Sequence, residues 1–171
     1  MARQGRIAIR PFLFVMMISA LNILFLLSLS LWVGSIFFLS FINAPALFRE
    51  LPREMAGEFV GKLFPAYFML GYALQGLAML SLALRGILER PFPWVRLALL
   101  LLMLGCTLYA GIGIQPRAHA LRSVVRSMED GREKELKQAQ FNRLHKTSVL
   151  LNSAVFLMGI VVIGVTAVRL R

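Results

Sequence analysis

The chain has 171 residues, of which 58% are hydrophobic and only 16% are charged. Soluble domains average roughly 25% charged and about 45–50% apolar residues, so this composition excludes an ordinary soluble domain and indicates one integral membrane domain. The 19 Lys and Arg residues lie mostly at the ends of apolar runs, and no basic stripe outside those runs carries interleaved aromatics, so we expect contacts with anionic lipid headgroups and none with nucleic acid.

The first predicted membrane crossing covers residues 21–44. Arg10 and Arg49 bracket 38 residues without a formal charge, which as one helix would run to about 57 Å, against a hydrocarbon core of about 30 Å. We therefore assign residues 1–20 to a basic, interfacial N-terminal segment, interpreted as an uncleaved anchor because no signal-peptide cleavage site follows it. Pro45 is expected to end or kink the first helix.

A surface helix over residues 50–62 and a second crossing over residues 63–84 come next. Four apolar residues recur at intervals of four: Leu47, Leu51, Met55 and Phe59. Charged residues occupy the rest of this segment, which is the pattern of a helix lying in the membrane plane. Gly57 and Gly61 are spaced for close approach of a neighbouring helix, and Pro65 fits the first turn of the second crossing.

The third and fourth crossings are predicted over residues 97–116 and 147–168, with surface helices over residues 117–146 between them. An interruption is expected at Asp130 and Gly131, after which the second surface helix can run directly into the fourth crossing. Each odd crossing leads to a surface helix and then to an even crossing, but these units lack matched residues, so we do not infer a duplication. The fold class is therefore all-α: an integral membrane four-helix bundle over residues 21–171, with amphipathic interfacial helices in the first and third connections.

The distribution of positive charge bears on orientation. Eleven Lys and Arg residues lie in the first and third connections, against eight in the termini and the second connection. Four crossings place both termini on one side, and the excess of positive charge favours cytoplasmic first and third connections. We expect a multi-pass protein of the inner membrane of a bacterium.

Polar residues in and beside the crossings predict a binding pocket near one membrane face. The candidate ligand-binding residues are Trp32, Asn43, Gln75, His145, Ser148 and Asn152. The last three share one helix face, and an asparagine in the membrane interior needs a hydrogen-bond partner, for which Asn43 and Gln75 are the candidates. The alternative is that these groups only join helices to one another. No ionisable residue lies in the middle of a crossing, which argues against a proton-driven mechanism.

Two further groups raise metal or haem chemistry as alternatives. His119 and His145 flank the same connection at the membrane border, so a bis-histidine haem or metal site is one interpretation and headgroup contact is the other. Cys106, the single cysteine, lies near Met103, which suggests either soft-metal handling or simple packing. We expect no cofactor, with haem as the alternative.

Several motifs together resemble a known family. They are Leu31-Trp32-Val33-Gly34, Asn43-Ala44-Pro45-Ala46-Leu47-Phe48, Leu51-Pro52-Arg53-Glu54-Met55-Ala56-Gly57, Phe64-Pro65, and Phe141-Asn142-Arg143-Leu144-His145 with Ser148 and Asn152. From about residue 21 to the end, the chain resembles the transmembrane-protein-205-like family, whose bacterial members form domain of unknown function 4149. The resemblance implies a four-helix membrane protein, and the association of the eukaryotic relatives with platinum-drug resistance implies export or trafficking of a soft metal complex.

These observations lead to one functional prediction and two alternatives. We predict a small, non-enzymatic membrane protein that binds or translocates a small amphiphilic or hydrophobic ligand, a lipid or a metal complex in a polar pocket of the bundle. The alternatives are a haem-binding redox protein that uses the border histidines and a scaffold that forms homo-oligomers. Five residues are predicted to have structural roles: Gly34, Pro45, Gly57, Gly61 and Pro65.

Overall fold

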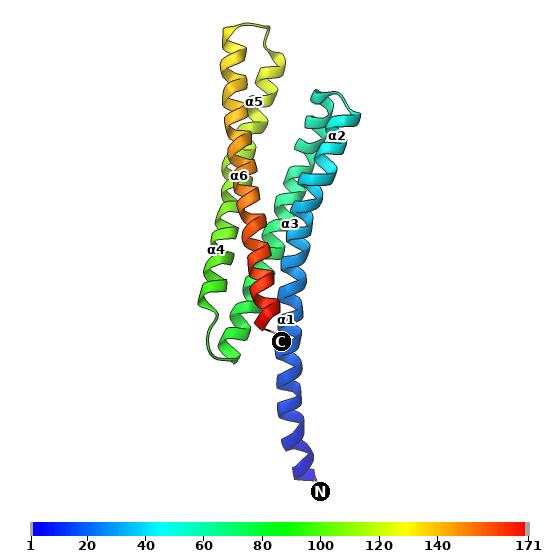
Figure 1. The fold of residues 1–171 in the computed structure, drawn as a ribbon, viewed down its shortest axis with the longest axis vertical. Helices are drawn as coiled ribbons and strands as arrows, with labels where there is room; N and C mark the ends of the chain where they lie inside the picture. The colour runs from blue at the N-terminus through cyan, green and yellow to red at the C-terminus, as the bar shows by residue number, and fades with distance from the viewer. Residues whose placement is uncertain (1, 170–171) are drawn as a thin grey trace.

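The computed structural model describes the backbone of residues 2–169 and the side chains of residues 12–168, and over this range its regular elements are all helical (Figure 1). Four helical segments are long and apolar enough to cross a membrane. The predicted all-α four-helix membrane bundle is therefore confirmed. Both termini lie at the same end of the bundle, and the N-terminal part of the first helix extends past the other helices (Figure 1).

The chain forms two helical hairpins. The first consists of α1 (Ala2–Phe37), the π-helix η1 (Phe38–Asn43), α2 (Ala44–Glu50) and the returning α3 (Arg53–Leu88). The second consists of α4 (Trp94–Leu108), the π-helix η2 (Tyr109–Ile114), α5 (Gln115–Ser127) and the returning α6 (Arg132–Arg169). We call residues 44–62 and 115–146, which lie beyond the uncharged runs, the cap.

The hydrophobic core lies on the terminus side of the cap. Helices α1 and α4 each pack against both α3 and α6, so α3 and α6 lie at opposite corners of the bundle. The core residues are Phe25, Leu29, Trp32, Val33, Ile36, Ala78, Leu82, Leu100, Met103, Val155 and Val162. By contrast, α2 and α5 bury none of their residues. In Figure 1 the α2 end of the first hairpin and the tip of the second hairpin stand apart, while the lower parts of the two hairpins lie side by side.

Some predicted boundaries are wrong. Residues 50–62 do not form a separate helix in the membrane plane, because α3 runs without a break from Arg53 through Pro65 to Leu88. Pro65 therefore lies inside a helix and not in its first turn. A helix in lipid keeps its backbone hydrogen bonds internal, which favours one long helix over two helices with a loop, and prolines are tolerated in such helices. Helix α1 likewise shows no boundary at residue 20, although the side chains of residues 1–11 lie outside the described part.

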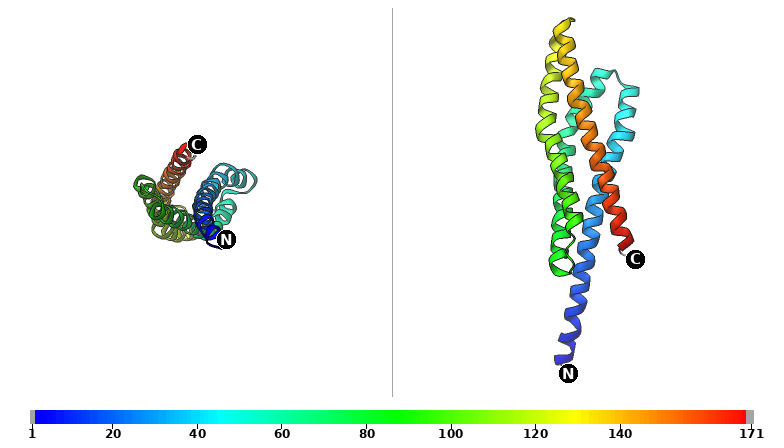
Figure 2. Two further views of the ribbon diagram at one scale, coloured as in Figure 1. Left: turned by 90° about the horizontal axis from the view of Figure 1, so that it is seen from below. Right: turned by 60° about the vertical axis from the view of Figure 1, so that its left-hand side comes forward.

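The structure of the third connection agrees better with the prediction made from the sequence. The chain leaves helical geometry at residues 128–131, where Asp130 and Gly131 predicted an interruption. Helix α6 then runs continuously from the cap into the fourth crossing, as the absence of proline and glycine between Arg132 and Lys146 indicated. The cap helices of this hairpin stand along the bundle axis as extensions of the crossings (Figure 2).

Two prolines are accommodated by π-helices. Proline lacks an N–H donor and crowds the carbonyl four residues earlier, which normally interrupts a helix. Immediately before Pro45 the hydrogen bonds change to a five-residue spacing, with the Ala44 N–H bonded to the carbonyl of Leu39. Immediately before Pro116 the Gln115 N–H bonds to the carbonyl of Ala110 in the same way. Wider turns thus replace the predicted helix ends.

The two hairpins carry these π-helices at matched positions. Phe38 and Tyr109, where the π-helices begin, are 71 residues apart, and so are Pro45 and Pro116. The same interval relates four buried residues of α1 to four of α4: Phe25, Leu29, Trp32 and Ile36 to Arg96, Leu100, Met103 and Thr107. The hairpins are therefore similar units, although their residues at these positions differ.

Candidate functional site: a polar chain between the two hairpins

Three polar side chains from three elements form a continuous hydrogen-bonded chain inside the apolar part of the bundle. The hydroxyl of Tyr67 on α3 donates to Oδ1 of Asn152 on α6 at 2.7 Å, and Nδ2 of Asn152 donates to Oγ of Ser40 on η1 at 3.2 Å. Asn152 lies five residues beyond Thr147, where the fourth uncharged run begins, so it is about 8 Å below the cap along the helix axis. We call these three residues the polar chain.

The π-helix changes what the Ser40 hydroxyl does. The hydroxyls of Ser28, Ser35 and Ser81 each donate to the carbonyl four residues earlier in their own helix. The hydroxyl of Ser40 accepts from Asn152 instead, and makes no such bond among the described residues. Ser40 is exposed on the surface of the bundle. The outer end of the polar chain therefore presents a hydroxyl donor to the membrane.

The inner end of the polar chain packs on a buried tryptophan. The rings of Trp32 and Tyr67 lie 5.0 Å apart between centroids. Trp32 is 1% exposed, and a side chain at Gly71 would overlap its ring, so the glycine is needed for α3 to approach α1 here. The indole Nε1 of Trp32 is buried and has no hydrogen-bond partner among the described residues. An unpaired buried donor is costly and is rare in native structures.

A second buried polar pair lies deeper in the bundle. Nε2 of Gln75 donates to Oγ1 of Thr107 at 3.0 Å and to the carbonyl of Gly71 at 3.1 Å. The Thr107 hydroxyl in turn donates to the carbonyl of Met103. Within the described part of the chain, Oε1 of Gln75 is buried without a partner. Two buried polar atoms thus lack a partner among the described residues: the acceptor Oε1 of Gln75 and the donor Nε1 of Trp32.

Aromatic side chains adjoin the polar chain on the lipid side. Phe37 and Phe41 are 46% and 61% exposed, and their ring centroids are 5.3 Å apart. Phe156, one turn beyond Asn152, lies 5.9 Å from Phe41 between ring centroids. A polar group bordered by exposed apolar rings suits a molecule with one polar end and an apolar body.

The predicted pocket residues separate into different places. We expected Asn152 to pair with Asn43 or Gln75. It pairs instead with Tyr67 and Ser40. Asn43 ends η1 and is half-buried, without a hydrogen bond among the described side chains. Ser148 is half-buried on α6. Two hollows at the surface of the cap contain none of the six candidates among their lining residues.

The two histidines make no ring contact with each other in the described part of the chain. The His145 ring stacks on Phe141 with 6.2 Å between centroids, and the Arg122 guanidinium lies 5.6 Å above the same Phe141 ring. Burial of the imidazole, and then the positive charge of Arg122, lower the pKa of His145. His119 is exposed on α5.

The other metal candidates form no cluster. Met103 is fully buried in the core, and Cys106 is half-buried against it. Within the described residues no three His, Cys, Asp or Glu side chains lie close enough to hold a metal ion. The packing of Met103 and Cys106 is that of ordinary core residues.

Two arginines of α5 join the cap parts of the two hairpins. Nη1 of Arg122 donates to the carbonyl of Gly57 on α3, and Nη1 of Arg126 lies 3.2 Å from Oε2 of Glu58. A side chain at Gly57 would overlap the Arg122 guanidinium, whereas a Cβ at Gly61 would stand 3.8 Å from it. Gly57 thus admits an arginine side chain and not a neighbouring helix backbone. We call these two contacts the clasp.

The carboxylate in the clasp is electrostatically stabilised. A hydrogen bond from Lys62, and then one from Arg126, lower the pKa of Glu58, with the charges of both residues acting in the same direction. Glu58 lies before the second uncharged run and its ion pair with Lys62 measures 2.9 Å. The pair is exposed, so its contribution is screened by salt.

Sequence reasoning missed the residues that make most of these contacts, namely Ser40, Tyr67, Thr107 and Arg122. Gly34, by contrast, faces open space, with nothing within 4 Å of where a Cβ would stand. The one available signal was that Tyr67 and Asn152 lie four and five residues after the first residue of their uncharged runs, which places them at similar depths.

Comparison with known proteins identifies a family whose sequence pattern the chain matches. Residues 27–126 match the family described as Domain of unknown function (DUF4149), which is more than half of the chain. The chain belongs to the DUF4149 family. The DUF4149 match includes Ser40, Tyr67 and Arg122 but ends before α6, and therefore before Asn152.

A relative from Aquifex aeolicus (strain VF5), printed as "Uncharacterized protein", is 50% identical over 54 residues. This match covers 32% of the present chain and 39% of the relative, so the chain spans well under two thirds of the length of that relative. No solved structure matches the chain.

Proposed function

We propose that this DUF4149 protein binds a small amphiphilic molecule between its two hairpins, with the polar end of the molecule at Ser40 and Asn152. The observation that carries the proposal is the polar chain itself. It links three helical elements inside the apolar zone and ends in an exposed hydroxyl whose donor has no protein acceptor among the described residues. In lipid, such a donor needs a partner that water cannot supply.

The surroundings define the chemistry of the ligand. The exposed rings of Phe37 and Phe41 offer apolar surface beside Ser40, which favours an alkyl or ring system lying along the bundle. Ser40 offers a donor, so the polar end of the ligand is expected to carry an acceptor such as a hydroxyl, an ester or a phosphate oxygen. The depth of the site, about 8 Å below the cap, matches an amphiphile whose polar end lies just under the headgroups.

The unpaired atoms of Trp32 and Gln75 support the same proposal. The indole donor and the amide acceptor are both buried, and both side chains contact Gly71: the Trp32 ring packs against it, and the Gln75 amide donates to its carbonyl. One small polar molecule, or a water that enters with the ligand, would pair with such groups. Simple joining of helices would favour pairing of every buried polar atom. The two unused atoms therefore favour binding over a purely structural role.

We further propose the inner membrane of a bacterium as the location, which the Aquifex relative supports. Membership of the wider transmembrane-protein-205-like group, and a role in transport or in resistance, stay predictions. A homo-oligomeric scaffold and a haem protein also stay predictions, because no contact among the described residues favours either.

The experiment is identification of small molecules retained by the purified protein. The protein is extracted from its own membranes in mild detergent, and its organic extract is analysed by mass spectrometry beside Asn152→Ala and a matched control, Asn142→Ala. Asn142 is an exposed cap residue that bonds Gln138 in its own helix. We expect one amphiphile in excess of bulk lipid in the wild type and the control, and roughly threefold to tenfold less in Asn152→Ala, because one hydrogen bond is lost. Equal retention by all three proteins would overturn the proposal.

A further inference from the structure

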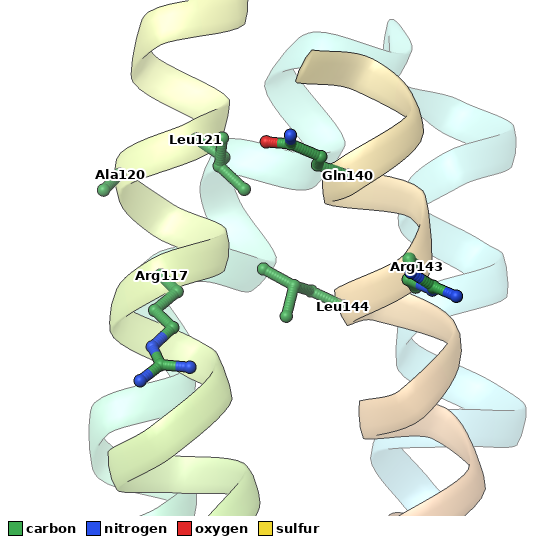
Figure 3. Close-up of a pocket in the computed structure, with 6 residues that line it drawn as sticks. All are labelled: Arg117, Ala120, Leu121, Gln140, Arg143 and Leu144. Atoms are coloured by element: carbon green, nitrogen blue, oxygen red, sulfur yellow. The ribbon is translucent and has the colours of Figure 1, made fainter. Parts of the chain in front are cut away.

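A groove lies on the cap between α5 and α6, away from the polar chain. Its volume is about 500 Å³, and it is open to the surroundings along one side. The lining residues are Arg117, Ala120, Leu121, Gln140, Arg143 and Leu144. Figure 3 shows that three of them come from each of the two antiparallel helices.

The groove has an apolar floor and a polar rim. The side chains of Leu121 and Leu144 point toward one another between the helices, while Ala120 leaves α5 on the side away from α6 in this view (Figure 3). The amide of Gln140 lies above them. The Arg117 side chain extends along α5 below them, while Arg143 leaves α6 on the side away from α5 (Figure 3). Arginine side chains are long enough for an exposed one such as Arg143 to turn back over the groove.

The two arginines of the rim make no ion pair among the described residues. Elsewhere on the cap, Arg126 pairs with Glu58, and Lys134 pairs with Asp130 at 2.7 Å. All acidic residues of the third connection lie between residues 129 and 135, at the far tip of the cap. Residues 115–128 and 136–147 contain six Lys and Arg residues and no Asp or Glu. The membrane-facing half of this hairpin's cap is therefore cationic and lacks its own counter-ions.

The groove lies at the level of the lipid headgroups. Arg117 directly follows Pro116, where the third uncharged run ends, and Arg143 precedes the start of the fourth run at Thr147 by four residues, which is about 6 Å. Guanidinium groups at this depth meet lipid phosphates, and the apolar floor below them meets the upper part of an acyl chain.

We propose that this groove is a binding site for one anionic glycerophospholipid of the surrounding bilayer. Arg117 and Arg143 hold the phosphate, because a guanidinium presents paired N–H donors that match two phosphate oxygens. Gln140 donates to the polar headgroup, and Leu121 and Leu144 receive the first carbons of an acyl chain. The site is distinct from the polar chain, since Leu144 and Asn152 are two turns apart on α6.

The test is native mass spectrometry of the full chain released from detergent containing equal amounts of a phosphatidylglycerol and a phosphatidylcholine with the same acyl chains. We expect the wild type to retain the phosphatidylglycerol in preference by about tenfold or more, since each juxtamembrane cation contributes roughly fivefold. The double variant R117Q/R143Q should lose most of this preference. The double variant R132Q/K134Q removes the same charge from the tip of the cap, where Lys134 pairs with Asp130, and should keep the preference within about twofold.

Two further experiments distinguish binding of a lipid from binding of a free anion. They also test the proposal if R117Q/R143Q folds poorly. Leu121→Asn makes the floor polar while both arginines remain, and should lower phosphatidylglycerol retention as strongly as the double variant does. Inorganic phosphate added in large excess should not displace the lipid, because it cannot occupy the floor. Equal loss in R132Q/K134Q, full retention by Leu121→Asn, or displacement by inorganic phosphate would each overturn the proposal.

Discussion

The Tyr67 hydroxyl donates a 2.7 Å hydrogen bond to Asn152 and thereby joins α3 and α6, which lie at opposite corners of the bundle. These helices belong to different hairpins. Asn152 lies about 8 Å below the cap along the helix axis, so the bond joins the hairpins just below the level of the clasp. Because the partner atoms come from separate hairpins, the bond contributes directly to holding the two hairpins together.

Replacement of Tyr67 by Phe should lower the free energy of unfolding. Hydrogen bonds between membrane helices contribute about 0.6 kcal/mol on average and up to about 1.7 kcal/mol. We expect a loss in that range, measured by reversible unfolding in mixed micelles. A double-mutant cycle of Tyr67→Phe with Asn152→Ala should show coupling of similar size. Tyr109→Phe, at a tyrosine that is 57% exposed, is the matched control and should leave stability unchanged. Additive effects in the cycle would contradict the bond.

Replacement of Gly71 by Ala should displace Trp32. A Cβ at Gly71 overlaps the Trp32 ring, and overpacking of this kind typically costs about 1–3 kcal/mol. In a Trp94→Phe background Trp32 is the only tryptophan, so a change in its fluorescence emission reports its movement. Gly76→Ala, with nothing within 4 Å of the new Cβ, should leave the emission unchanged. An unchanged emission in Gly71→Ala would show that the two helices approach differently.

Replacement of Gly57 by Ala should open the clasp without unfolding the protein. The new Cβ meets only the end of the flexible Arg122 side chain, which can swing away. With Cys106 replaced by Ser and spin labels at Met55 and Val124, pulsed electron resonance should record a longer and broader distance distribution. Gly61→Ala makes only an ordinary contact and should match the parent. Equal distributions in all three proteins would mean that Arg122 does not hold the hairpins together.

The same spin labels should detect a pH dependence. Because Lys62 and then Arg126 lower the pKa of Glu58, the clasp is fully formed above the ordinary glutamate pKa of about 4.3 and weakens as the pH falls through the lowered value. We expect a constant distribution from neutral pH down to that region and a broader one below it. Glu58→Gln should be broad at every pH. Asp130→Asn removes a similar ion pair within one hairpin and should retain the transition; its loss there would assign the transition to another group.

Much of the fold could be predicted from the sequence, because uncharged runs of 20 residues or more have few alternatives to membrane helices. Several wrongly predicted helix boundaries lie at proline residues. Pro45 and Pro116 were expected to end or kink their helices and Pro65 to begin one, yet the chain remains helical through all three. Proline restricts the local backbone, but whether a π turn absorbs that restriction depends on packing along the whole helix.

The candidate site was harder to predict, for a related reason. Asn152 was correctly singled out as a polar group that needs a partner, but its partners were assigned by residue type. Ser40 was overlooked because a serine in a helix usually bonds its own backbone, and the π-helix that frees it is not visible in the sequence. The similarity of the two hairpins was noticed only as a repeated order of helices, since its detail resides in backbone geometry and burial and not in matched residue types.

The central claim is that the polar chain is a site that a membrane-dissolved amphiphile enters. It is tested most directly by quenching of Trp32 fluorescence in the Trp94→Phe protein, reconstituted in bilayers, with a short nitroxide-labelled alkanol. The alkanol should quench Trp32 with a saturable dependence on its concentration, and an unlabelled alkanol should reverse the quenching. Ser40→Phe should abolish the saturable part, while Ser35→Ala should retain it, because Ser35 bonds only its own helix. Quenching that rises linearly with concentration in all three proteins would contradict the account.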